Sequence, residues 1–110
     1  MKKLLERYSE LSAVFAMSDV MAIGAMRAVR EAGLNVPEDV SVVGFDGVEI
    51  GKYLYPMLTT VKQPMYDIAK YSFDTLMKCI DGDDAVHTLL PFSFQKRGSS
   101  AHIDGRRILD

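Results

Sequence analysis

The chain has 110 residues, 48% of them hydrophobic and 25% charged, which is enough for about one globular domain. Its 13 basic and 15 acidic side chains give a net charge of −2, which excludes a global basic field for nucleic acid or an anionic membrane. A single cysteine, Cys79, excludes an intramolecular disulfide and favours a reducing cytoplasm, and no apolar run approaches the roughly 20 residues that span a bilayer.

The first predicted elements in chain order are a short amphipathic helix over residues 2–11 and an apolar strand over residues 13–17. Ser18 and Asp19 follow this strand, and either side chain can cap the next helix by accepting a backbone N–H bond. That helix runs to about Ala32 and ends at glycine 33, because glycine readily takes the left-handed conformation that closes a helix.

Two apolar residues of this second helix, Val20 and Ile23, fall on its charged side when the helix advances 100° per residue. One interpretation is that they are isolated apolar residues on the surface, which are common. The other is that they contact another chain. The pattern alone leaves both interpretations open.

The stretch from Val36 to Ile50, VPEDVSVVGFDGVEI, contains the strand around which the other elements are organised. Residues 40–45 form a short β-branched apolar run, typical of a strand that is buried on both faces. Gly44 indicates that another group approaches the backbone closely. Asp46 follows where the strand ends, and open α/β sheets bind their ligands at that edge.

The second half of the chain continues the alternation of helices and strands, which predicts an α/β fold with a mostly parallel sheet. The helix predicted from Pro64 to Ile80 is the clearest one, and its apolar stripe includes Cys79, which is therefore predicted to be an inert core residue. Pro91 places the last strand at an edge of the sheet. The remaining ranges are a turn or short helix at 48–54, strands at 58–62 and 89–96, and a mobile tail at 98–110.

Three polar side chains, Ser18, Asp46 and Gln63, follow strand ends and therefore share one edge of a parallel sheet. A hydroxyl, a carboxylate and an amide suit a neutral polyol or a purine edge. The local alternative is that Ser18 and Asp46 cap helices and that Gln63 satisfies backbone groups near Pro64. Nucleophile, metal-ligand and phosphate-loop motifs are absent, so we predict no enzyme activity, metal or cofactor.

The segments FAMSDVMAIGAMRAVREAGLNVPEDVSVVGFD and YPMLTTVKQP resemble the C-terminal half of the effector-binding domain of LacI/GalR-type transcription regulators. The resemblance covers about Leu11 to Ser99. It implies a partial periplasmic-binding-protein-like (type I) lobe over residues 1–97, which senses a sugar or nucleobase in a cleft between two lobes.

The resemblance also implies roles for particular residues. Ser18 stands where the family often has an asparagine that touches the ligand, so this shorter side chain puts the identity of the sugar in doubt. Asp46 matches an aspartate that bonds ligand hydroxyls or a base nitrogen, and Gln63 matches a glutamine at the crossover into the other lobe. The family's subunit interface maps onto Ile23 and the 48–55 segment, which implies a homodimer through Val20, Ile23, Val48, Tyr53 and Tyr55.

Family members carry an N-terminal helix-turn-helix, a hinge helix and a second lobe, and this chain begins after all of them. We therefore expect DNA binding only through a helix-turn-helix domain outside this chain, and an apolar face on the 64–80 helix without its usual partner. The first functional hypothesis is the sensing and dimerisation module of a regulator. The second is a truncated stand-alone interaction protein that pairs with a full-length regulator through the Ile23 and 48–55 surface.

Overall fold

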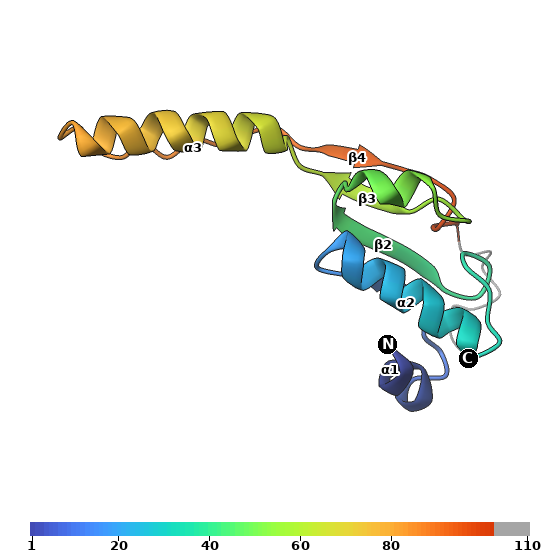
Figure 1. Cartoon of the computed structure of the whole chain (residues 1–110). Coiled ribbons are helices and arrows are strands. Elements are labelled where there is room, and N and C mark those ends of the chain that lie inside the picture. The colour runs from blue at the N-terminus through green and yellow to red at the C-terminus, as the bar shows by residue number, and fades with distance from the viewer. Residues whose placement is uncertain (103–110) are drawn as a thin grey trace. The chain divides into compact units, whose positions relative to one another are not determined.

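The computed structural model describes residues 1–102 and confirms the α/β fold (Figure 1). One four-stranded sheet has the order β1-β2-β3-β4. The elements are α1 (Lys2–Arg7), β1 (Ala13–Phe15), α2 (Asp19–Glu31), β2 (Ser41–Asp46), the 3-10 helix η1 (Glu49–Lys52), β3 (Thr59–Lys62), α3 (Met65–Ile80) and β4 (Ser93–Gln95).

The central strands are parallel, as the alternation predicts. Phe15 of β1 pairs with Val43 of β2, and Asp46 of β2 pairs with Lys62 of β3. The strand β4 lies at one edge of the sheet, the position that Pro91 indicates. The chain divides into two compact units, one of residues 1–62 with 94–102 and one of residues 63–93.

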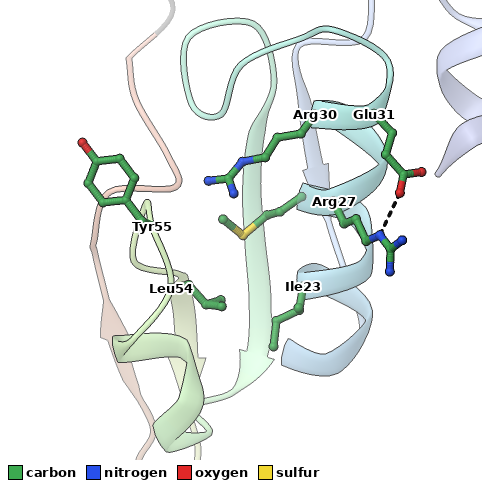
Figure 2. Close-up of a pocket in the computed structure, with 7 residues that line it drawn as sticks. Ile23, Arg27, Arg30, Glu31, Leu54 and Tyr55 are labelled. Atoms are coloured by element: carbon green, nitrogen blue, oxygen red, sulfur yellow. Dashed lines mark hydrogen bonds and ion pairs between the residues drawn. The ribbon is translucent and has the colours of Figure 1, made fainter.

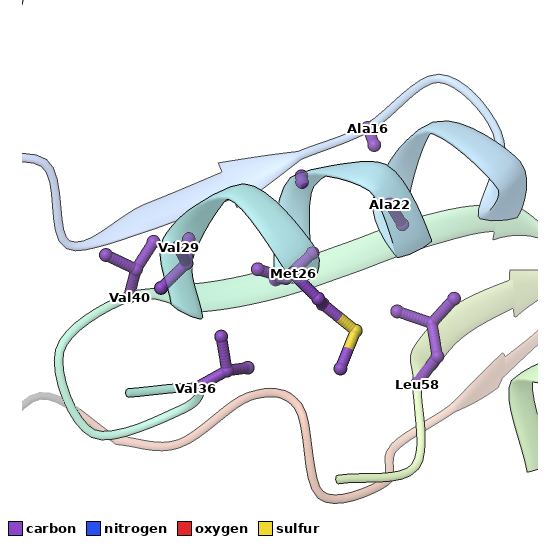
Figure 3. Packing of buried hydrophobic residues seen from close by; sticks show 9 residues of the cluster. Ala16, Ala22, Met26, Val29, Val36, Val40 and Leu58 are labelled. Atoms are coloured by element: carbon purple, nitrogen blue, oxygen red, sulfur yellow. The ribbon is translucent and has the colours of Figure 1, made fainter. Parts of the chain in front are cut away.

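The core of the first unit lies between α2 and β2 (Figure 3). Helix α2 begins at Ser18, whose hydroxyl accepts a hydrogen bond of 3.2 Å from the backbone N–H of Met21, and it is followed by Gly33 at φ 76°. Met21, in the first turn of α2, is 58% exposed. The buried cluster consists of Ala16, Ala22, Ala25, Met26, Val29, Val36, Val40, Val42 and Leu58.

The segment that follows β4 is bound to the sheet, which corrects the prediction that a mobile tail starts at residue 98. Ser99 is fully buried, and its hydroxyl donates to the carbonyl of Val42 at 2.6 Å while accepting from the backbone N–H of Thr59 at 2.8 Å. Ala101 also donates its backbone N–H to Ser41 Oγ at 3.1 Å. The prediction failed because hydrogen bonds, rather than an apolar pattern, hold this polar segment. Residues 103–110 of the predicted tail lie outside the described residues.

The second unit contains α3, and the predicted helix is confirmed almost to its ends. No residue of α3 is buried. Its apolar stripe includes Phe73, Leu76 and Ile80, which are 63%, 57% and 67% exposed. Cys79 is exposed as well, so the interpretation of this thiol as a core residue is wrong. The 3.6-residue pattern predicts which residues share a face, but it does not predict what covers that face.

Candidate functional site

Two of the three predicted ligand-binding residues lie at the same edge of the sheet. Ser18 follows the end of β1 and Asp46 is the last residue of β2. Since Phe15 pairs with Val43, both Ser18 and Asp46 stand three residues beyond a paired position. This edge is formed by the carboxyl ends of parallel strands, where α/β sheets bind ligands.

Asp46 has an unusual backbone conformation for a residue with a side chain. Its φ is 115°, and the next residue, Gly47, has φ 79°. A Cβ atom on Gly47 would lie 2.6 Å from Cβ of Lys62, so the turn packs tightly against the end of β3. Strained backbone of this kind costs on the order of 1–3 kcal/mol and clusters at binding sites. The strain therefore marks Asp46 as a candidate site residue independently of its position.

Ser18 has the local role that the sequence left open, because its side chain caps α2. The cap uses one acceptor lone pair of the hydroxyl, and a serine hydroxyl has a second lone pair and a donor proton. Ser18 is half-buried. The capping role therefore leaves hydrogen-bonding capacity for a ligand at this edge.

Gln63 directly follows β3 and is the first residue of the second unit. Its backbone carbonyl accepts a hydrogen bond of 3.0 Å from the N–H of Met65, and its side chain is half-buried. The boundary between the units therefore falls between Lys62 and Gln63. The role of the Gln63 side chain in ligand binding stays a prediction.

Sequence reasoning missed one buried carboxylate at this edge. Asp19 is fully buried, and it accepts hydrogen bonds from the backbone N–H of Val48 at 2.7 Å and from the hydroxyl of Thr60 at 2.5 Å. The available signal was Gly44, because a Cβ atom there would collide with Oδ1 of Asp19. The sequence correctly predicted a close approach at Gly44 and did not identify the group that makes it.

The residues predicted to form a subunit interface are largely accessible. Val20, Tyr53 and Tyr55 are 71%, 82% and 90% exposed, while Ile23 and Val48 are half-buried. Beside them, a pocket of about 350 Å³ opens between α2 and the segment after η1 (Figure 2). Arg27 Nε donates to Glu31 at 2.7 Å on its rim. The lining residues are Ile23, Met26, Arg27, Arg30, Glu31, Leu54 and Tyr55.

The pKa of one carboxyl group on the rim of this pocket, that of Glu31, is perturbed. Hydrogen bonds from Lys2 and Arg27 lower the pKa of the Glu31 carboxyl below its ordinary value of 4.5. The Lys2–Glu31 ion pair, 2.7 Å long, connects α1 to the end of α2. These pairs are exposed, so their contribution to stability is small.

The family model for the periplasmic binding protein-like domain matches residues 1–100. The chain belongs to this family. It is 43% identical over 103 residues to the HTH-type transcriptional regulator MalR of Clostridium butyricum. This alignment covers 92% of this chain and 30% of MalR. MalR thus extends well beyond the part that this chain matches.

Solved structures of LacI-family regulators have the same fold. A complex of the transcriptional regulator CelR with cellobiose matches 90% of this chain and 31% of that chain, with 35% identity and a TM-score of 0.85. The lac repressor dimer, bound to operator and the anti-inducer ONPF, matches 92% of this chain and 36% of that chain, with 36% identity and a TM-score of 0.83.

These relatives confirm the resemblance to the effector-binding domain of LacI-type regulators, and with it the periplasmic-binding-protein-like fold. The chain spans about a third of the length of the regulators that it matches. Its named relatives are transcription regulators rather than enzymes. Among the described residues, no helix is long and apolar enough to cross a membrane.

Proposed function

We propose that this chain is part of the effector-sensing and dimerisation domain of a bacterial transcription regulator. The effector is a small sugar, or a nucleobase of similar size, that binds at the carboxyl edge of the sheet. The observation that carries the proposal is Asp46, a carboxylate in a left-handed conformation at the end of β2. The CelR–cellobiose complex, with 35% identity, favours the sugar class.

In this mechanism the Asp46 carboxylate accepts hydrogen bonds from ligand hydroxyls. The Ser18 hydroxyl forms a hydrogen bond with the same ligand. Hydrogen bonds to a carboxylate are stronger than those between neutral groups. Gln63, which directly follows β3, supplies an amide to the ligand. A ligand that binds one conformation of the domain more tightly shifts the equilibrium toward it, and that shift changes the affinity for DNA.

The partners follow from the same assignment. A second copy of the chain binds through Val20, Ile23, Val48, Tyr53 and Tyr55, consistent with the exposed apolar groups there and with the dimeric lac repressor. DNA contacts come from a helix-turn-helix domain outside these 110 residues, because a net charge of −2 offers no basic surface. The regulator acts in the cytoplasm without a cofactor or a catalytic step.

The alternative of a stand-alone interaction protein gains no support from the comparisons, since the named relatives are regulators. The proposal is tested by calorimetric titration of the gene product that carries this chain. The ligands are ribose, glucose, maltose and cellobiose, with adenine and hypoxanthine as the nucleobase arm. We expect saturable binding of at least one sugar. Heats at the dilution level for all six compounds contradict the proposal.

A further inference from the structure

Building on the proposed function, we propose that Asp19 is a positioning residue of the effector site. Its buried carboxylate fixes the turn of residues 46–48, so that Asp46 is held in its binding conformation. Asp19 itself does not contact the ligand in this account. It acts through the backbone of Val48 and through Thr60.

The contacts of Asp19 join three elements of the sheet edge. Asp19 begins α2, and its Oδ2 accepts from the backbone N–H of Val48, which lies two residues beyond Asp46. Its Oδ1 accepts from the Thr60 hydroxyl in β3. Because Asp19 is fully buried, its carboxylate lies away from water, where hydrogen bonds to a carboxylate are strongest. One side chain therefore ties α2 and β3 to the turn after β2.

The middle of β2 provides space for this carboxylate. A Cβ atom at position 44 would collide with Oδ1 of Asp19 and would lie 3.2 Å from Cδ2 of Leu58. Only glycine therefore permits the carboxylate to lie against the strand. Gly44 and Asp19 therefore depend on each other: because position 44 carries no side chain, the Asp19 carboxylate can reach the turn.

The turn needs such support because two successive residues have positive φ, 115° at Asp46 and 79° at Gly47. A strained residue persists only when its surroundings determine the conformation. On one side, the close packing of Gly47 against Lys62 restrains the backbone of the turn. On the other side, the hydrogen bond from the Val48 N–H to Asp19 restrains it. Without this second restraint the backbone of Asp46 is free to relax to negative φ.

A buried aspartate with a purely structural role would lower stability on removal and nothing more. The two roles are separated with three variants of the gene product that carries this chain. Asp19→Ala removes both acceptors, whereas Asp19→Asn still accepts from Val48 and can donate to the Thr60 hydroxyl. The control is Val40→Ala, which makes a cavity in the core at the other end of β2, where Val40 is fully buried.

The first measurement is amide hydrogen exchange, which needs no effector. In Asp19→Ala we expect the Val48 amide to exchange about tenfold faster or more than in Val40→Ala, as for loss of a bond to a charged group. We expect Asp19→Asn to stay near wild type. Equal protection of Val48 in the Asp19→Ala and Val40→Ala variants overturns the proposal.

The second measurement is the calorimetric affinity for cellobiose, or for whichever of the other titrated sugars the wild type binds. We expect Asp19→Ala to lose about tenfold or more, Asp19→Asn to stay within about threefold, and Val40→Ala to match wild type. If Asp19→Ala and Val40→Ala bind alike, the positioning role is wrong although the effector site stands. If the wild type binds no titrated compound, the proposed function itself fails.

Should Asp19→Ala not fold, Gly44→Ala is the second variant, because its new methyl group displaces the Asp19 carboxylate while both of its donors, the Val48 N–H and the Thr60 hydroxyl, are kept. The same faster exchange of Val48 and the same loss of sugar affinity are expected. Wild-type values for both measurements in Gly44→Ala overturn the proposal.

Discussion

The hydroxyl of Ser99 donates to the carbonyl of Val42 across 57 residues of sequence, at 2.6 Å. The same hydroxyl accepts from the backbone N–H of Thr59, so one side chain bonds to both central strands. Val42 and Thr59 lie near the beginnings of β2 and β3, whereas Asp46 lies at the opposite end of β2, where it pairs with Lys62. The alignment of the two strands that carry the candidate site therefore depends in part on the segment around Ser99.

Ser99→Ala should lower the free energy of unfolding by roughly 1–3 kcal/mol, because it leaves a buried carbonyl and a buried N–H without their partner. Urea denaturation measures the change. Ser9→Ala is the matched control, since Ser9 is exposed and bonds only to the neighbouring Glu10. If both variants unfold at the wild-type urea concentration, the segment around Ser99 does not hold the strands.

The backbone of Asp46 gives a second prediction, which separates strain from chemistry. Asp46→Gly and Asp46→Ala both remove the carboxylate, but only glycine accommodates φ 115° without strain. Relief of about 1–3 kcal/mol exceeds the roughly 0.4–1 kcal/mol that glycine costs through the unfolded chain. Asp46→Gly should therefore be more stable than Asp46→Ala by about 1 kcal/mol in urea denaturation. Equal stability of the two variants would show that Asp46 is not strained in solution.

The third prediction concerns the subunit interface. The wild-type chain should scatter light as a dimer at tens of micromolar, and Ile23→Lys should be a monomer because it places a charge among the apolar residues of the predicted interface. Leu89→Lys is the control, since Leu89 is fully exposed in the second unit. A wild-type monomer, or a dimer that survives Ile23→Lys, contradicts the interface.

The fourth prediction concerns pH. Lys2 and Arg27 lower the pKa of Glu31, so the stabilisation from these pairs is present above the ordinary value of 4.5 and is lost as the pH falls through the lower folded value. Lys2→Ala should raise the pKa of Glu31 in an NMR titration, whereas Lys3→Ala should leave it unchanged. An unshifted Glu31 in Lys2→Ala would place Lys2 elsewhere in solution.

Much of the fold was predictable because local signals decide it. The β-branched run gives β2, Ser18 and Gly33 delimit α2, and Pro64 begins the segment that becomes α3. Gly44 indicated a close contact, but the sequence cannot name a partner 25 residues away. Asp19 was therefore considered only as a helix cap.

The errors have a common cause. Ser99 was assigned to the tail because polar residues that bond to strands leave no periodic pattern in the sequence. Cys79 was assigned to a core because an apolar stripe identifies a face and not its partner. Ser99 has tertiary hydrogen bonds, and Cys79 has no covering partner among the described residues. Neither feature is encoded in the local sequence pattern.

The central claim is that Asp46 binds the effector, and Asp46→Asn tests it most directly. The substitution keeps the size of the side chain and removes its charge, so affinity for the bound sugar should fall by roughly 1–3 kcal/mol, or about 5- to 150-fold. Asp74→Asn, an exposed position on α3, should leave the affinity unchanged. Calorimetric titration of both variants with the sugar that the wild type binds decides the matter: a loss confined to Asp46→Asn is the expected result, and an unchanged dissociation constant for Asp46→Asn contradicts the account.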